Sequence, residues 1–158
     1  MGVDLIGVGL TYNWNGWHTL YDLGVAFGWR PAGTLLPEET AEPYQFSYPP
    51  DEDPGPRGGY FSNDFHWVTD ADAAAWARAI HRAVDVMAGT AVAGTEQEAE
   101  ALRRLQAKNE EGDKQIEALT REQPKVKAAL DALAFPGSTE EWLRQFADAA
   151  ARRGFMIS

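Results

Sequence analysis

The residues best suited to chemistry stand in one short string of aromatic and polar side chains, Tyr60-Phe61-Ser62-Asn63-Asp64, which His66 follows closely. A carboxylate and an imidazole can share a divalent cation, and a histidine can act as a general base. The same Ser, Asn and Asp side chains can equally close a turn by bonding to backbone amides. The string therefore predicts either a polar pocket or a structural turn.

A second string, Asn13-Trp14-Asn15-Gly16-Trp17-His18, has the same two interpretations. It can begin a helix whose tryptophans enter the core, or its rings can form the wall of a ligand pocket. In the second interpretation both strings contribute to one candidate ligand pocket, made of Trp14, Trp17, His18, Tyr60, Ser62, Asn63, Asp64, His66 and Trp67. We assign no catalytic residue and expect neither a metal nor a cofactor.

The strands that must position these strings are short. Residues 3–10 have the pattern of a strand, and Phe155-Met156-Ile157 is long enough to pair with it. Further short strands are expected near residues 60–68, on both sides of the polar string. These segments predict one small sheet that joins the two ends of the chain.

Helices are predicted where apolar residues recur at spacings of three and four. The clearest helix begins at Thr69 and ends at Gly89. Other residues that can cap a helix start are Asn13 or Asn15, Thr95 and Ser138. The predicted fold class is α+β and mainly helical, with about five helices packed on the small sheet.

The aromatic residues indicate how the chain is organised, because aromatic rings dominate core burial. None of the 18 lies between Ala77 and Ala134. We therefore expect a single domain over residues 1–158, with a core built from residues 1–88 and 135–158 and a helical insert over residues 89–134. In the alternative interpretation, the insert is the outer layer of one compact helical domain.

The insert carries a heptad stripe over residues 102–133, with polar or glycine lapses at Asn109, Gly112 and Gln123. A glycine costs a helix about 1 kcal/mol relative to alanine, and Pro124 fits the first turn of a new helix. The pattern favours two or three shorter antiparallel helices. A dimeric coiled coil is the alternative.

Charge excludes some classes of partner. The chain has 24 acidic and 14 basic side chains, which makes binding of nucleic acid or of an anionic membrane through a basic surface unfavourable. The segment 36–59 alone sums to −5 and contains six of the nine prolines, so it predicts an exposed acidic loop. Its candidate partner-binding residues are Glu38, Glu39, Glu42, Asp51, Glu52 and Asp53.

Several short motifs carry a resemblance to a known family. They are Met1-Gly2-Val3-Asp4-Leu5, Asn15-Gly16-Trp17, Gly28-Trp29-Arg30-Pro31-Ala32-Gly33-Thr34, the Tyr60–Asp64 string with Val68-Thr69-x-x-Asp72-Ala73, and Phe146-Ala147-Asp148 with Gly154-Phe155. With these motifs the chain resembles a family of small uncharacterised bacterial and phage-associated proteins. The resemblance implies no activity and no functional residue, and it does not extend to the acidic loop or the insert.

Three functions follow from these patterns. We expect first a cytoplasmic, non-enzymatic protein, a monomer or weak dimer, that binds a basic protein partner as an immunity protein binds a basic toxin. No apolar run approaches the length of a membrane span, and the N-terminus lacks the positive charge of a signal peptide. The alternatives are a small-molecule or metal-dependent enzyme near Asn63, Asp64 and His66, and a structural protein that self-associates through residues 102–133.

Overall fold

A computed structural model of the chain describes residues 2–35, 59–61, 66–122 and 139–158. Their elements are, in order, β1 (Gly2–Ile6), β2 (Leu10–Asn13), α1 (Trp14–Ala26), β3 (His66–Val68), α2 (Asp70–Met87), α3 (Glu96–Glu122), α5 (Thr139–Ala150) and β4 (Phe155–Ile157). The four helices and four strands of these residues confirm the predicted class, α+β and mainly helical.

The four strands form one antiparallel sheet in the order β2-β1-β4-β3. The C-terminal strand lies in its middle, with Ile157 opposite Leu5 of β1 and Phe155 opposite Val68 of β3. The predicted pairing of the two chain ends is therefore confirmed. Residues 3–10, however, form a hairpin rather than one strand.

Two glycines explain the hairpin. Gly7 and Gly9 have φ angles of +102° and +70°, which side chains rarely tolerate, and between them the backbone reverses direction from β1 into β2. The hydrophobic pattern of residues 3–10 does not show this reversal, because Val8 and Leu10 still pack against the core.

The predicted strand at Tyr60-Phe61 is wrong, since Gly59, Tyr60 and Phe61 form a turn of 3₁₀ helix. A Cβ atom at Gly59 would lie 2.0 Å from Nδ1 of His66, so only glycine allows the chain to pass so close to β3. This turn directs the Tyr60 side chain into the core, where it is fully buried. The predicted strand around His66 and Trp67 is present as β3.

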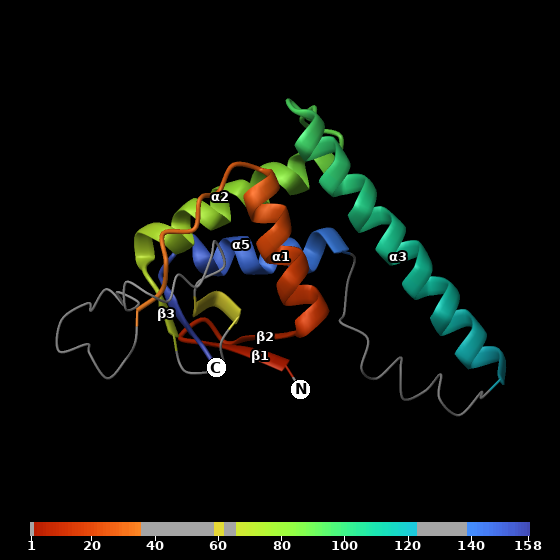
Figure 1. The fold of residues 1–158 in the computed structure, drawn as a ribbon, viewed down its shortest axis with the longest axis horizontal. Helices are drawn as coiled ribbons and strands as arrows, with labels where there is room; N and C mark the ends of the chain where they lie inside the picture. The colour runs from red at the N-terminus through yellow and green to blue at the C-terminus, as the bar shows by residue number, and fades with distance from the viewer. Residues whose placement is uncertain (1, 36–58, 62–65, 123–138) are drawn as a thin grey trace, which may run out of the picture.

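Helices α1, α2 and α5 lie on one side of the sheet, and the core fills the space between these two layers (Figure 1). Trp76 of α2 is central to it, with ring-centroid distances of 5.1 Å to Trp17 and 4.9 Å to Phe146. Trp29 stacks on Trp76 at 4.1 Å, and Phe155 of β4 lies 6.3 Å from Trp17. Aromatic rings from both ends of the chain therefore form one connected cluster.

The predicted helix caps within the described residues are confirmed. Oδ1 of Asn13 accepts the amide of Gly16 at 2.7 Å at the start of α1. The hydroxyl of Thr69 caps α2 and that of Thr95 caps α3 in the same way. The fourth predicted cap, Ser138, lies outside the described residues.

Helix α3 is a single helix of 27 residues, which leads away from the body (Figure 1). The predicted break at Asn109 and Gly112 is wrong. One glycine destabilises a helix by about 1 kcal/mol relative to alanine. Side-chain pairs on both sides of it, such as Arg121 with Glu117, each stabilise the helix by a few tenths of a kcal/mol. The restart predicted at Pro124 lies outside the described residues. Within those residues, no helix is long and apolar enough to cross a membrane.

Candidate functional site

Much of the chemistry proposed from sequence falls outside the described residues. This holds for the six acidic residues Glu38, Glu39, Glu42, Asp51, Glu52 and Asp53, and for Ser62, Asn63 and Asp64. The described part of the candidate ligand pocket consists of Trp14, Trp17, His18, Tyr60, His66 and Trp67.

Two of these residues belong to the core rather than to the wall of an open pocket. Trp17 and Tyr60 have no accessible surface, and the indole N–H of Trp17 donates to the carbonyl of Tyr60 at 2.7 Å. On the outer side of α1, His18 stacks on Phe61 at 4.5 Å, and Trp14 lies 6.3 Å from His18. The predicted pocket wall is therefore split between the core and the surface.

His66 and Trp67 also separate, because neighbours on a strand face opposite sides. His66 is 5% exposed, and its Nδ1 lies 2.7 Å from the hydroxyl of Thr34. Trp67 is half-buried, and its backbone pairs with Leu35. Within the described ranges, no three acidic or histidine side chains are placed to hold a metal ion.

Asp72 forms a buried polar centre that the sequence did not reveal. It is 4% exposed and accepts hydrogen bonds from Trp29 Nε1 at 2.9 Å, from the Ala32 amide at 3.2 Å and from the Tyr60 hydroxyl. Its position in the first turn of α2 also suits a negative charge. In the sequence, Asp72 stood out only as part of the motif Val68-Thr69-x-x-Asp72-Ala73.

The Tyr60 hydroxyl is equally well satisfied. It donates to Asp72 and accepts the amide of Gly33 at 3.0 Å. Burial raises the pKa of Tyr60 far above its ordinary value, and the hydrogen bond to Asp72 raises it further. This centre ties the segment after α1 to the start of α2, and its groups are fully used by the fold.

Tyr12 presents the opposite case. It is 4% exposed, burial raises its pKa well above the ordinary value, and its hydroxyl oxygen has no hydrogen-bond partner. Among the described residues, the Tyr12 hydroxyl oxygen is the one buried side-chain nitrogen or oxygen atom without a hydrogen-bond partner. A buried hydroxyl without a partner costs about 1–3 kcal/mol. The Tyr12 ring lies in the wall of a cleft.

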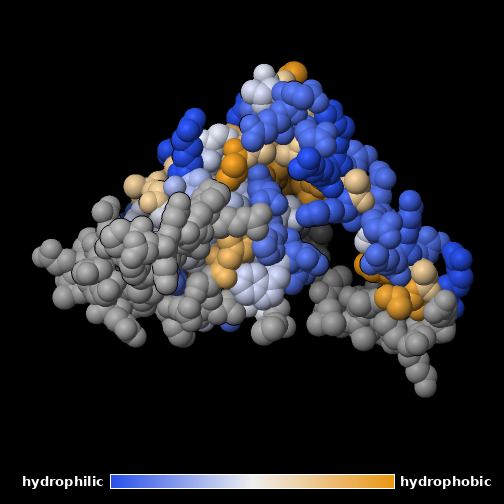
Figure 2. Space-filling model, viewed as in Figure 1, coloured by the Kyte–Doolittle hydropathy of each residue, from blue (hydrophilic) through white to orange (hydrophobic). Residues whose placement is uncertain are grey.

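That cleft, which we call the arm cleft, has a volume of about 720 Å³ and lies between the start of α1, the middle of α3 and the start of α5. In Figure 2 the molecule is hollowed between the body and α3. The cleft is lined by Tyr12, Asn13, Asn15, Gly16, Thr19, Leu105, Ala107, Lys108, Asn109, Glu111, Gly112, Gln115 and Trp142. No pattern in the sequence indicates this cleft, because its lining comes from the four separate elements β2, α1, α3 and α5.

A second cleft of about 700 Å³ lies on the other side of the contact between α1 and α3. Thr19, Leu105 and Lys108 line both clefts. Leu105 is 6% exposed and is the buried anchor of α3 on the body. The contact between α3 and the body is therefore narrow, with one cleft on each side of it.

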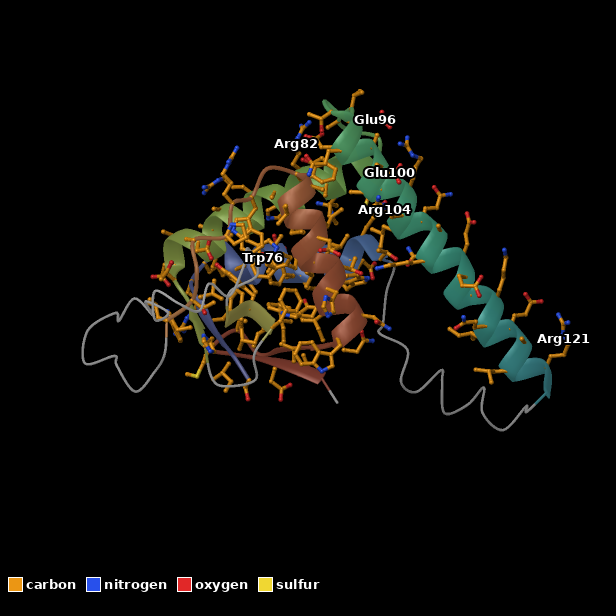
Figure 3. The ribbon with its side chains drawn as sticks, in the orientation of Figure 1. Trp76, Arg82, Glu96, Glu100, Arg104 and Arg121 are labelled. Carbon is orange, nitrogen blue, oxygen red and sulfur yellow. The ribbon has the colours of Figure 1, made fainter. Side chains whose placement is uncertain are left out.

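An ion pair holds the base of α3 on α2. Arg82 donates to both carboxylate oxygens of Glu98, at 3.3 and 2.9 Å, and the amide of Gly94 donates to the same carboxylate at 2.9 Å. These contacts, with Arg82 first, hold the pKa of Glu98 below its usual range. Figure 3 shows Arg82 at the corner where α2 meets α3.

The far half of α3 is exposed and acidic. Ile116 and Leu119 are each 47% exposed, and Figure 2 shows apolar atoms toward the far end of the helix. From Glu110 to Glu122 the helix has five acidic and two basic side chains. We call this segment the distal arm.

Comparison of the chain with protein-family models, with curated proteins and with solved structures finds no match. The function is therefore argued from the two features that the fold does not use for its own packing, the distal arm and the arm cleft.

Proposed function

We propose that the protein is a non-catalytic binding protein whose distal arm docks a basic protein partner. The observation that carries the proposal is the exposed apolar pair Ile116 and Leu119 on a helix segment that is rich in acid and leaves the body. An inhibitor of the immunity type, which binds a basic toxin, is one concrete form of this function.

Each part of the distal arm has a role in such binding. Its surplus of carboxylates attracts a basic surface and speeds encounter, an effect that salt screens. Ile116 and Leu119 lie three positions apart on one helix face and provide an apolar anchor once the partner arrives. By sequence, the segment 36–59 adds six carboxylates of the same sign.

The test is capture of partners from a lysate of the source cell by the immobilised full-length protein. We expect a basic protein to be retained at about 0.05 M salt and released near 0.5 M, because the Debye length falls from about 14 to about 4 Å. A variant with Ile116→Ser and Leu119→Ser should lose it. The control Ile6→Ser should keep it, since Ile6 is similarly exposed, at 44%, on the sheet.

Charge is tested separately from the apolar anchor. Glu110→Gln with Asp113→Asn neutralises two carboxylates of the distal arm, and Glu96→Gln with Glu100→Gln neutralises two near its base. The first pair should reduce retention more than the second. Equal retention at both salt concentrations, or retention by the Ile116 and Leu119 variant, contradicts the proposal.

Self-association through the same stripe is the second candidate. It is favoured by Gly112, one turn before Ile116, where an added Cβ would meet nothing within 4 Å and a second helix can approach closely. The measurement is the solution mass of the full chain at about 100 µM. A dimer that Ile116→Ser abolishes supports this candidate, and a monomer excludes it.

A further inference from the structure

The arm cleft has a lining that suits a particular class of ligand. Most of its polar side chains are uncharged and can form hydrogen bonds in both directions, as amides and hydroxyls do. These are Asn13, Asn15, Thr19, Asn109 and Gln115. The two charged residues of the lining, Lys108 and Glu111, have opposite signs, and Glu111 accepts a hydrogen bond from Gln115 at 3.1 Å.

Aromatic rings form part of the same wall. Tyr12 and Trp142 lie 5.9 Å apart with a tilt of 53°. The negatively charged face of such a ring attracts the weakly positive C–H groups of a ligand. Gly16 and Gly112 also line the cleft and add no side chain to fill it. The cleft therefore combines an aromatic surface, side-chain amide groups and unfilled space for a ligand.

The hydroxyl of Tyr12 is an independent observation at the same place. It is buried in the cleft wall and lacks any partner, whereas buried hydroxyl groups normally have one. Trp142, which packs beside it, is only partly buried. Because this hydroxyl is buried, a ligand in the cleft would reach it only after neighbouring side chains move.

We propose that the arm cleft is a binding site for a neutral saccharide. A sugar presents hydroxyl groups that both donate and accept, which complement an exposed amide such as that of Asn15, and a C–H face that can lie on Trp142. A volume of about 720 Å³ lies within the range of small-molecule sites, ~300–1,000 Å³. The cleft shares Glu111, Gly112 and Gln115 with the distal arm, but Ile116 and Leu119, the proposed partner anchor, do not line it.

Other ligand classes fit the lining less well. A phosphate or carboxylate would meet Lys108 as the one cation that lines the cleft among the described residues, and it would also meet Glu111. A purely apolar ligand would cover the exposed amide of Asn15 without replacing the hydrogen bonds that this amide makes with water.

The test is two-dimensional NMR of the full-length, isotope-labelled protein with defined probes. The saccharides are maltose, cellobiose and N,N′-diacetylchitobiose, each up to about 10 mM, a range that detects millimolar affinity. Adenosine and para-hydroxybenzoate represent other ligand classes. We expect at least one saccharide to shift the Trp142 indole N–H signal and the side-chain amide signals of Asn15 and Gln115 in a saturable manner.

Two variants and one control complete the experiment. Asn15→Ala and Tyr12→Phe each remove one hydrogen-bonding group and should weaken binding about threefold to tenfold. Tyr12→Phe should do so without loss of thermal stability, because its hydroxyl has no partner in the free protein. The control, Gln145→Ala, removes an exposed amide of α5 that does not line the cleft and should bind as the wild type does.

Three results would overturn the proposal. The first is that none of the saccharides shifts these signals. The second is that only adenosine or para-hydroxybenzoate binds, which would assign the cleft to another ligand class. The third is that Asn15→Ala and Tyr12→Phe both bind saccharide with the affinity of the wild type.

Discussion

Two buried tyrosines show how differently the two sides of this molecule are built. Tyr60 lies between α2 and the segment that follows α1, and its hydroxyl is bonded to Asp72 and Gly33. Tyr12 lines the cleft between the body and α3 and is also buried, but its hydroxyl has no partner. The first region is complete without a ligand, whereas the second leaves a polar group and a cleft unused. We therefore assign a structural role to Tyr60, whereas Tyr12 belongs to the cleft that we propose as a ligand site.

The largest effect is expected at Asp72. Asp72→Ala would leave the buried donors of Trp29, Ala32 and Tyr60 without their acceptor and should destabilise the protein by about 3 kcal/mol or more. Urea unfolding measures this, with Asp72→Asn as a control that keeps one acceptor oxygen. A loss below about 1 kcal/mol would mean that this centre is not structural.

Tyr60→Phe should have the next largest effect. It removes a hydrogen bond to a buried carboxylate and should destabilise the protein by about 1.5–3 kcal/mol in the same unfolding assay. If the variant is as stable as the wild type, the contrast with Tyr12 fails, because neither hydroxyl would then contribute to stability.

A smaller effect, and one that depends on pH, is expected at the base of α3. Contacts with Arg82 lower the pKa of Glu98, so the stabilisation that they provide is complete above the unfolded-state value near 4.5 and is lost as the pH falls through the lowered value. Glu98→Gln should therefore speed proteolysis of α3 at neutral pH and make no difference in acid.

The matched control for this experiment is Glu100→Gln, which neutralises a carboxylate two residues further along α3 that pairs with Arg103 and Arg104 in an exposed position. The protease should cleave this variant at the wild-type rate, since exposed ion pairs contribute little to stability. If both variants are cut equally fast, the contact between Arg82 and Glu98 does not hold α3 on the body.

The smallest effect, and the one of opposite sign, is expected at Tyr12. Tyr12→Phe removes a buried hydroxyl that has no partner. The free energy of unfolding should stay constant or increase by up to about 1 kcal/mol, and the melting temperature should stay constant or rise accordingly. A clear loss of stability would show that the hydroxyl is used by the fold, and the two tyrosines would then be alike.

The sequence predicted local features well. The caps at Asn13, Thr69 and Thr95 depend on contacts within three residues, and the structure confirms them. The pairing of the two chain ends was also predicted, since a short apolar strand at Phe155–Ile157 had few other places to pack.

Features that depend on distant partners were missed. Asp72 meets Trp29, which is 43 residues earlier in the chain, and spacing alone cannot show such a contact. The arm cleft is invisible in sequence for the same reason. The hairpin at Gly7 and Gly9 was missed because glycine permits a left-handed turn without requiring one.

The central place of β4 has a consequence for how the sheet holds together. Strands β1 and β3 each pair with β4 and not with each other, so Phe155–Ile157 is the strand that joins them. The ring of Phe155 also lies 6.3 Å from that of Trp76, so the same strand connects the sheet to the aromatic cluster. Loss of this one short strand would therefore divide the sheet into two parts and remove a ring from the core at the same time.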